Sequence, residues 1–206
     1  MDHTHCCHKE QDPSLSADPA ILYSLYQRID TEKVQCLNES VDGSGMTVFK
    51  PWEDRLDVSK FVESEVDQEL LFYVPFTVPV KLKGIVVIGG EDIQHPKDLK
   101  IFKNQPPLGF DAVMGEADQT IELSKDYNGS IEYPLKVARF NSVTSILLFF
   151  PTNYGAENTR IYYIGLRGEA LEHQAQGIVV ATYEAAPNPA DHETTSFIPA
   201  GTDYIA

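Results

Sequence analysis

The sequence is poor in basic residues and has no long hydrophobic run. Its 206 residues include 16 Lys and Arg against 31 Asp and Glu, a net charge of −15. A shortage of positive charge disfavours binding to phosphate backbones and to anionic lipids, so we expect no direct nucleic-acid partner. No apolar run approaches the roughly 20 residues that a membrane helix needs, so we expect no membrane partner either.

Cysteine is also scarce. Cys6, Cys7 and Cys36 are too few, and odd in number, for a disulfide framework. No hydrophobic stretch of the signal-peptide kind follows Met1. We therefore predict free thiols in a soluble intracellular protein. The length and the 42% hydrophobic content suit one domain with a substantial core.

The two ends of the chain read differently from the middle. Residues 1–19 are polar and hold most of the His and Cys, so they are predicted to be a disordered tail. A short helical segment is expected from Ala20, because apolar residues recur three and four apart at Ile21, Leu22, Leu25, Tyr26 and Ile29. A second short turn would carry Val34 and Cys36. Residues 187–206 are predicted to be a flexible C-terminal tail, which leaves 20–186 as the domain.

Most of the domain reads as strands separated by Gly, Pro, Asn and Asp. The expected strands are Thr47–Lys50, Glu69–Val74, Val80–Ile88, Leu99–Asn104, Thr120–Leu123, Ile131–Val137, Thr144–Phe150, Arg160–Leu166 and Gly177–Tyr183. No helical stretch follows each strand, which argues against a parallel α/β sheet. The fold class is therefore all-β, an antiparallel β-sandwich or jelly roll.

Chemical motifs are sparse. His3, His5, Cys6, Cys7 and His8 resemble a metal-ligand cluster, but structural zinc sites take separated ligand pairs that close a fold, so we assign no metal or cofactor. No G-x-S-x-G elbow is present. His95 and His173 are predicted to be surface residues, and Cys36 a small buried one. The chain is therefore not expected to be an enzyme.

Two segments have more than one interpretation. The acidic run Glu63, Glu65, Asp67 and Glu69 would share one face of a strand. That face could bind a cation or a basic partner, but we favour an exposed face that discourages edge pairing. The loop Phe49-Lys50-Pro51-Trp52 holds the single tryptophan, which serves either as packing or as a binding anchor.

Several pieces in fixed order resemble the PITH domain family, whose name denotes the proteasome-interacting domain of a thioredoxin-like protein. These pieces are Cys36–Ser40, Val48–Trp52, Glu63–Leu71, Val74–Phe76, Val80–Gly84, Tyr163–Gly168 and Tyr183–His192. The resemblance covers about residues 16–192. The family's redox relative carries a Cys-x-x-Cys domain that this chain lacks, so redox activity is not transferred.

The resemblance implies a galactose-binding-like jelly roll in a monomeric protein of the cytoplasm and nucleus. It also implies docking on the proteasome regulatory particle and a regulatory adaptor role, with effects on transcription and differentiation. Candidate partner-binding residues lie in two matched segments, the Phe49–Trp52 loop and the C-terminal tail, namely Phe49, Lys50, Pro51, Trp52, Asp191 and His192. The alternative is a module that binds a small molecule or a carbohydrate.

Overall fold

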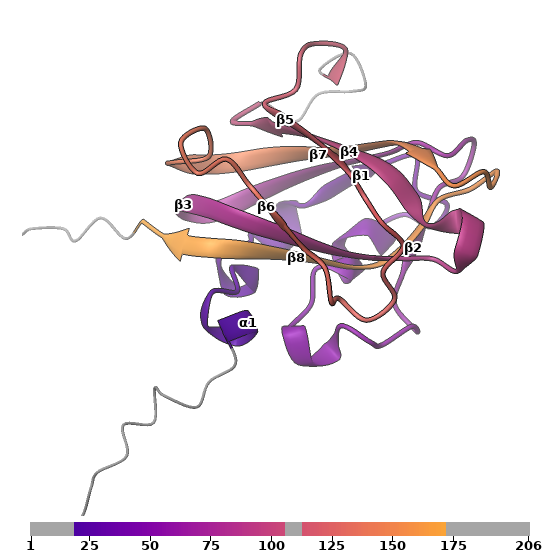
Figure 1. Ribbon diagram of the computed structural model, residues 1–206, viewed down its shortest axis with the longest axis horizontal. Helices are drawn as coiled ribbons and strands as arrows, with labels where there is room; N and C mark the ends of the chain where they lie inside the picture. Colours follow the sequence, from indigo (N-terminus) through magenta and orange to yellow (C-terminus); the bar gives the residue numbers. More distant parts are fainter. Residues whose placement is uncertain (1–18, 106–112, 172–206) are drawn as a thin grey trace, which may run out of the picture. The chain divides into compact units, whose positions relative to one another are not determined.

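A single 20-residue strand, β3 (Leu70–Gly89), organises the fold. The computed structural model describes residues 19–105 and 113–171 (Figure 1). Eight strands form one antiparallel sheet in the order β2-β8-β3-β7-β4-β5, and β1 and β6 also pair with β3. The other strands are β1 (Gln35–Leu37), β2 (Val62–Glu63), β4 (Pro96–Lys103), β5 (Gln119–Glu122), β6 (Glu132–Pro134), β7 (Val143–Asn153) and β8 (Arg160–Ala170).

Strand β3 changes partners along its length. Its first half pairs with β1 and β7, and its second half pairs with β6 and β8. The change falls at a register shift between Pro75 and Val80. Proline cannot donate to a sheet ladder and is tolerated at such irregularities. The two predicted strands Glu69–Val74 and Val80–Ile88 are therefore one strand that bends, a device that lets one sheet fold into two packed layers.

The remaining expected strands show where sequence patterns mislead. Those in β4 to β8 are confirmed within a few residues, although β6 keeps only three of its seven predicted residues. Thr47–Lys50 is wrong, because the 3-10 turn η4 (Ser44–Val48) includes its first two residues and the last two belong to no strand. Strands β1 and β2 were not predicted. The acidic run is not a continuous strand, since β2 ends at Glu63. The expected strand Gly177–Tyr183 lies outside the described residues.

The predicted N-terminal helix is also wrong as a continuous element. Only α1 (Pro19–Leu22) is helical, and the 3-10 turns η2 (Tyr26–Arg28) and η3 (Thr31–Lys33) follow it. The backbone between them bonds to β8 instead. The Leu25 N–H donates to the Leu166 carbonyl at 2.9 Å, and the Gly168 N–H donates to the Tyr23 carbonyl at 2.9 Å. Tertiary pairing therefore overrides the local helical pattern.

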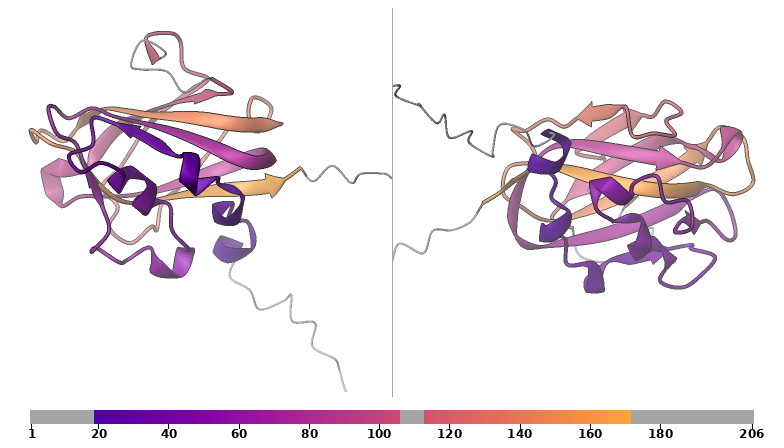
Figure 2. Two further views of the ribbon diagram at one scale, coloured as in Figure 1. Left: turned by 180° about the vertical axis from the view of Figure 1, so that it is seen from behind. Right: turned by 90° about the horizontal axis from the view of Figure 1, so that it is seen from below.

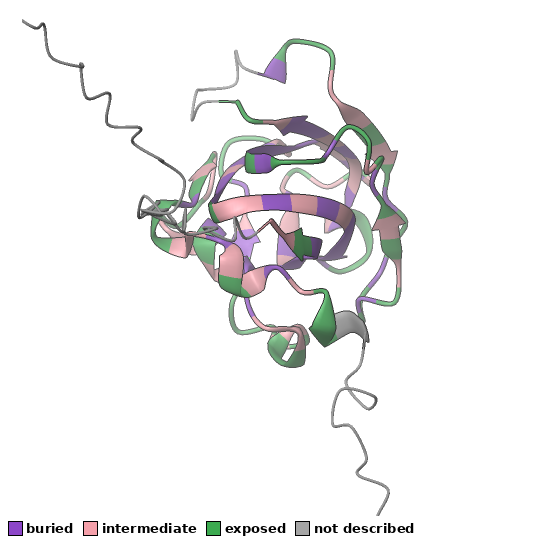
Figure 3. Cartoon of the chain, turned by 90° about the vertical axis from the view of Figure 1, so that its left-hand side faces the viewer, coloured by how far each residue is buried: buried purple, intermediate pink, exposed green. Residues whose placement is uncertain are grey.

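The apolar side chains of β3, β7 and β8 form the main core. Phe72, Leu148 and Leu166 are all at most 2% exposed, and buried colour is concentrated on the strands in Figure 3. The N-terminal turns lie together on one side of the strands (Figure 2). Two further 3-10 turns are η5 (Trp52–Asp54) and η6 (Asp92–Gln94). No helix in the described ranges is long and apolar enough to span a bilayer.

Candidate partner-binding site

The predicted loop Phe49–Trp52 divides into a buried half and a surface half. Phe49 is 3% exposed, and its ring packs edge to face on Phe72 with 6.1 Å between centroids. Lys50 is 6% exposed. Pro51 and Trp52 are half-buried. Of these four candidates, Pro51 and Trp52 are the ones whose side chains reach the surface, whereas Phe49 and Lys50 are buried.

Lys50 instead donates hydrogen bonds to the backbone of the segment that follows it. Its Nζ donates to the Asp57 carbonyl at 2.6 Å and to the Lys60 carbonyl at 3.2 Å. Burial lowers the pKa of Lys50, because the charged ammonium loses hydration. These two hydrogen bonds tie Lys50 to the end of the segment 50–60, and Trp52 lies within that segment.

Trp52 packs on the outer face of the sheet. Its ring lies edge to face with Tyr163, at 6.1 Å between centroids, beside Val86 and Ile88. Two guanidinium groups stack on the same indole: the Cζ of Arg55 lies 4.0 Å from the ring centroid and that of Arg167 lies 4.5 Å from it. Cation–π contacts of this kind hold an indole in place. Trp52 is therefore both a packed residue and a surface residue.

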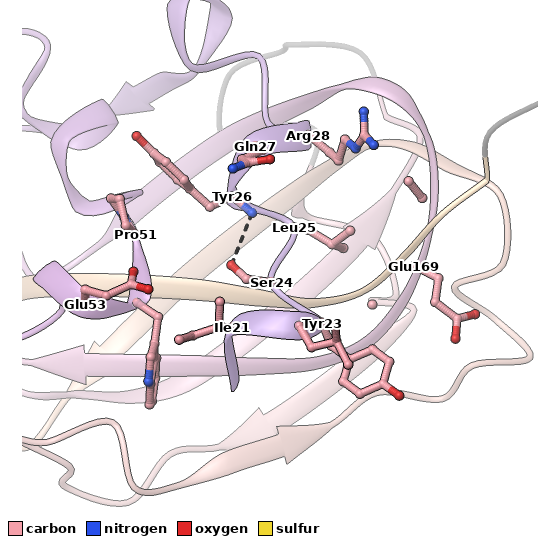
Figure 4. Close-up of a pocket in the computed structure, with 14 residues that line it drawn as sticks. Ile21, Tyr23, Ser24, Leu25, Tyr26, Gln27, Arg28, Pro51, Glu53 and Glu169 are labelled. Carbon is pink, nitrogen blue, oxygen red and sulfur yellow. Dashed lines mark hydrogen bonds between the residues drawn. The ribbon is translucent and has the colours of Figure 1, made fainter. Parts of the chain in front are cut away.

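Trp52 also forms part of the wall of a groove of about 520 Å³. The groove is lined by three segments that are far apart in the sequence, Ile21–Arg28, Pro51–Glu53 and Gly168–Ala170. Figure 4 shows Pro51 and Glu53 on one side of it and Glu169 on the other. In the N-terminal segment, Ile21 is 45% exposed, Leu22 61% and Tyr23 43%. Apolar side chains gathered at a groove are typical of a binding surface.

Arg167 lies beside this groove and is only 3% exposed. It follows Leu166 on β8, and it forms an isolated bridge with the groove residue Ser24. Its Nε and Nη1 are buried and have no hydrogen-bond partner among the described residues. Buried cations are normally paired, so this guanidinium is the most unusual electrostatic feature of the site.

His95 is not the surface residue that the sequence suggested, because it is fully buried at 0% exposed. Its Nδ1 lies 2.7 Å from the Pro96 carbonyl oxygen, and its Nε2 accepts the Asp126 N–H at 3.1 Å. This pattern requires a neutral ring protonated at Nδ1. Burial lowers the pKa of His95, although the neighbouring Asp126 carboxylate and its hydrogen bonds oppose this. The residue is structural: it joins β4 to the loop after β5.

Residues of the acidic run take part in side-chain contacts within the domain. The Arg160 guanidinium pairs with Glu63 at 2.8 Å, and the Asn38 amide donates to the Asp67 carboxylate at 2.7 Å. The carboxylates therefore do not share one face. Within residues 19–105 and 113–171, no three His, Cys, Asp or Glu side chains are grouped to hold a metal ion. The His3–His8 cluster and His173 lie outside the described residues.

A second pocket of about 420 Å³ lies at the loops that join the strands. Two tyrosines, Tyr127 and Tyr162, line it together with the carboxylates of Glu91 and Asp92. Arg55 also lines this pocket, and its guanidinium stacks on Trp52, which lines the first groove. Aromatic rings beside carboxylates are the groups that a polar ring-shaped ligand would use.

Sequence reasoning identified Pro51 and Trp52 but missed most of the groove. It read Ile21–Arg28 as an ordinary amphipathic helix, and it gave no role to Arg167. The available signal was a lone arginine in the apolar run of β8, inside a segment that matched the family pattern. The other two candidates, Asp191 and His192, lie outside the described residues.

Comparison with known proteins gives one family. The family model for the PITH domain matches residues 16–187. The chain is 49% identical over 210 residues to PITH domain-containing protein 1 of Xenopus laevis, covering 100% of both chains. It is 46% identical over 194 residues to PITH domain-containing protein 1 of Homo sapiens, covering 94% of this chain and 91% of the human one.

Solved structures with a similar fold are distant in sequence. The CBM32-1 and CBM32-2 domains of Clostridium perfringens ZmpB, solved in complex with GalNAc, match with a TM-score of 0.55 and 11% identity, over 78% of this chain and 40% of that one. A fucolectin from Morone saxatilis serum matches with a TM-score of 0.50 and 8% identity, over 72% of this chain and 49% of that one. These likenesses confirm the galactose-binding-like jelly roll and show the fold alone.

Proposed function

Because this chain belongs to the PITH domain family, whose members are protein-interaction modules, we propose that it docks on the regulatory particle of the 26S proteasome. It acts there as a non-catalytic regulatory adaptor of the cytoplasm and nucleus, and its influence on transcription and differentiation follows from that binding. It binds as a monomer. The relatives' names describe a domain and no enzymatic activity.

The observation that supports docking is the groove beside Trp52. Ile21, Leu22 and Tyr23 expose apolar surface on the one wall, and Trp52 stands on a rigid sheet at the other. Large aromatic anchors surrounded by apolar residues carry most of the binding energy in protein interfaces. The groove is open to a partner's segment without unfolding of the sheet.

Capture of purified 26S proteasome by immobilised protein tests the proposal. Leu22→Glu places a charge in the groove, at a side chain that is 61% exposed, and should abolish capture. Val66→Glu is the matched control, because Val66 is 83% exposed and lies away from the groove. It should capture as the unchanged protein does. If Leu22→Glu and Val66→Glu behave alike, the groove is not the docking surface.

The two ends of the chain are tested in the same assay. A variant without residues 1–15 should retain capture, because the family match begins at residue 16. Replacing both Asp191 and His192 by Ala tests the C-terminal candidates, and these changes should weaken capture. If the intact folded protein captures no proteasome at all, the docking proposal fails.

The pocket with Tyr127 and Tyr162 supports a second candidate, binding of a carbohydrate or another small polar molecule. Tyrosine rings beside the Glu91 and Asp92 carboxylates offer a stacking face together with hydrogen-bond acceptors. A glycan screen with Tyr162→Ala as the control variant tests it. Binding that survives this change, or no binding to any glycan, excludes this pocket as a sugar site.

A further inference from the structure

The groove beside Trp52 is locally positive in a protein of strongly negative charge. Three cationic side chains, Arg55, Lys83 and Arg167, contact aromatic residues that line the groove. Among the described residues, the carboxylates that line it are Glu53 and Glu169, and Glu169 is paired with Lys83. This leaves Arg55 and Arg167 against Glu53, a local excess of positive charge in a chain of net charge −15. Complementary charge steers a partner to a surface and selects its sign.

Arg167 supplies the second observation. It is only 3% exposed, and its Nε and Nη1 have no acceptor among residues 19–105 and 113–171. No carboxylate among the described residues lies within 4.0 Å of this guanidinium. A buried donor without an acceptor lowers stability, more so when it is charged. A buried guanidinium with two unpaired donors points to an acceptor that arrives from outside the domain.

We propose that the groove binds an acidic peptide segment of the partner, in which an apolar side chain stands next to a Glu or Asp. The carboxylate pairs with the Arg167 guanidinium, whose shape matches two oxygens. The neighbouring apolar side chain packs on Ile21 and Leu22. This names the partner chemistry of the docking groove and so rests on the proposed function.

The Trp52 indole makes the proposal measurable. Its ring stacks on Arg167, with 4.5 Å from the Cζ to the ring centroid, so a carboxylate that pairs with the guanidinium changes the electrostatic environment of the indole. Trp52 is also the single tryptophan of the chain, and its fluorescence therefore reports on this site alone.

The probes are two capped peptides, Ac-Ala-Leu-Glu-Ala-NH₂ and its Gln analogue. The Glu peptide should change the Trp52 emission in a saturable way and should bind about tenfold or more tightly than the Gln peptide, as expected for a hydrogen bond to a charged group. Equal responses to the two peptides, or none up to about 10 mM, a limit corresponding to negligible affinity, would overturn the proposal. Inorganic phosphate that binds as well as the Glu peptide would overturn the peptide as occupant.

Two variants separate binding from folding. R167M should lose the response to the Glu peptide while keeping or raising the melting temperature, because it replaces an unpaired buried charge by an apolar side chain. R160M is the matched control: the Arg160 Nε is also buried without a hydrogen-bond partner among the described residues, but this residue pairs with Glu63 and stacks on Phe61, neither of which lines the groove. It should leave the peptide response unchanged.

If R167M does not fold, R167K keeps the charge and should bind the Glu peptide more weakly while still preferring it to the Gln peptide. A purely structural arginine would instead lower the melting temperature when changed to Met and leave peptide binding intact, which contradicts the proposal. The peptide assay contains no proteasome. Its failure therefore leaves the docking proposal standing, and failure of proteasome capture leaves the acidic-peptide site standing.

Discussion

The Nε2 of His95 accepts a hydrogen bond from the backbone N–H of Asp126 at 3.1 Å, across 31 residues of sequence. The Asp126 carboxylate in turn accepts the backbone N–H groups of Asn128, Gly129 and Ile131 at 2.7–3.0 Å. Gly129 lies directly under this system: a Cβ there would sit 3.3 Å from the Trp52 ring. A buried imidazole is thus connected through one loop to Trp52, which forms part of the wall of the groove.

The burial of His95 predicts that the stability of the folded protein depends on pH. Above the ordinary imidazole pKa of about 6.5, His95 is neutral in both the folded and the unfolded chain. Burial lowers its pKa in the folded state, so as the pH falls below 6.5 the unfolded chain takes up a proton first. Stability should therefore decline from pH 6.5 down to the lowered pKa of the folded state and then receive no further contribution from His95.

Urea unfolding between pH 8 and pH 5 measures this effect. His95→Gln, which cannot be protonated, should show a smaller decline over the same range, although other groups that titrate there still contribute. The loops around His95 carry Lys125, Asp126, Tyr127 and Tyr154, and these are unchanged in the variant. Parallel curves for the two proteins would show that His95 is not held neutral.

Val86→Asp should destabilise the protein severely. Val86 is 1% exposed and lies in the cluster that supports Trp52. An unpaired buried carboxylate costs several kcal/mol, a large part of a typical stability of about 5–15 kcal/mol. Val66→Asp is the control, since Val66 is 83% exposed. Thermal denaturation should show a lower melting temperature for Val86→Asp and an unchanged one for Val66→Asp. An unchanged melting temperature for Val86→Asp would mean that β3 is exposed at this point.

Lys50→Glu should lower stability and should not act as a surface change. The variant sets a carboxylate against the carbonyl oxygens that Lys50 now donates to, those of Asp57 and Lys60. The expected loss is about 3–5 kcal/mol, as for one broken partner of a buried charged interaction. Lys60→Glu is the matched surface control. Equal urea midpoints for the two variants would contradict the burial of Lys50.

Cys36 should be an unreactive thiol. Burial raises its pKa far above the ordinary value, and the nearby Glu39 carboxylate adds to this. The thiolate is the reactive form, so the folded thiol should react at least about tenfold more slowly than the unfolded one. The test is labelling by DTNB of a C6S/C7S variant with and without urea. Equal rates would show that Cys36 is accessible.

Parts of the architecture and the site were predictable, and the reasons are visible in particular residues. The alternation and β-branching of β7 and β8 predict strands, because both are buried in a sheet where those residues pack well. The Pro75–Pro79 region was read as a break, since proline normally ends a strand, yet here the prolines stand at a bulge. Trp52 was named as a candidate, for packing or for binding, because a single tryptophan is distinctive in a sequence. Leu22 was not, because an exposed leucine has no special sequence signature.

By itself, the sequence determined the all-β fold class and the family, because hydrophobic periodicity, turn residues and motif order are local properties. Only the tertiary structure decided that Lys50 and His95 are buried, that β3 serves two layers, and that Arg167 stacks on Trp52 while its Nε and Nη1 have no hydrogen-bond partner among the described residues. Lys50 donates to carbonyls only 7 and 10 positions away. The other features depend on contacts between residues more than 30 positions apart, and such contacts follow from packing and backbone pairing across the sheet. The groove exists for the same reason, since its three walls meet only when the strands fold together.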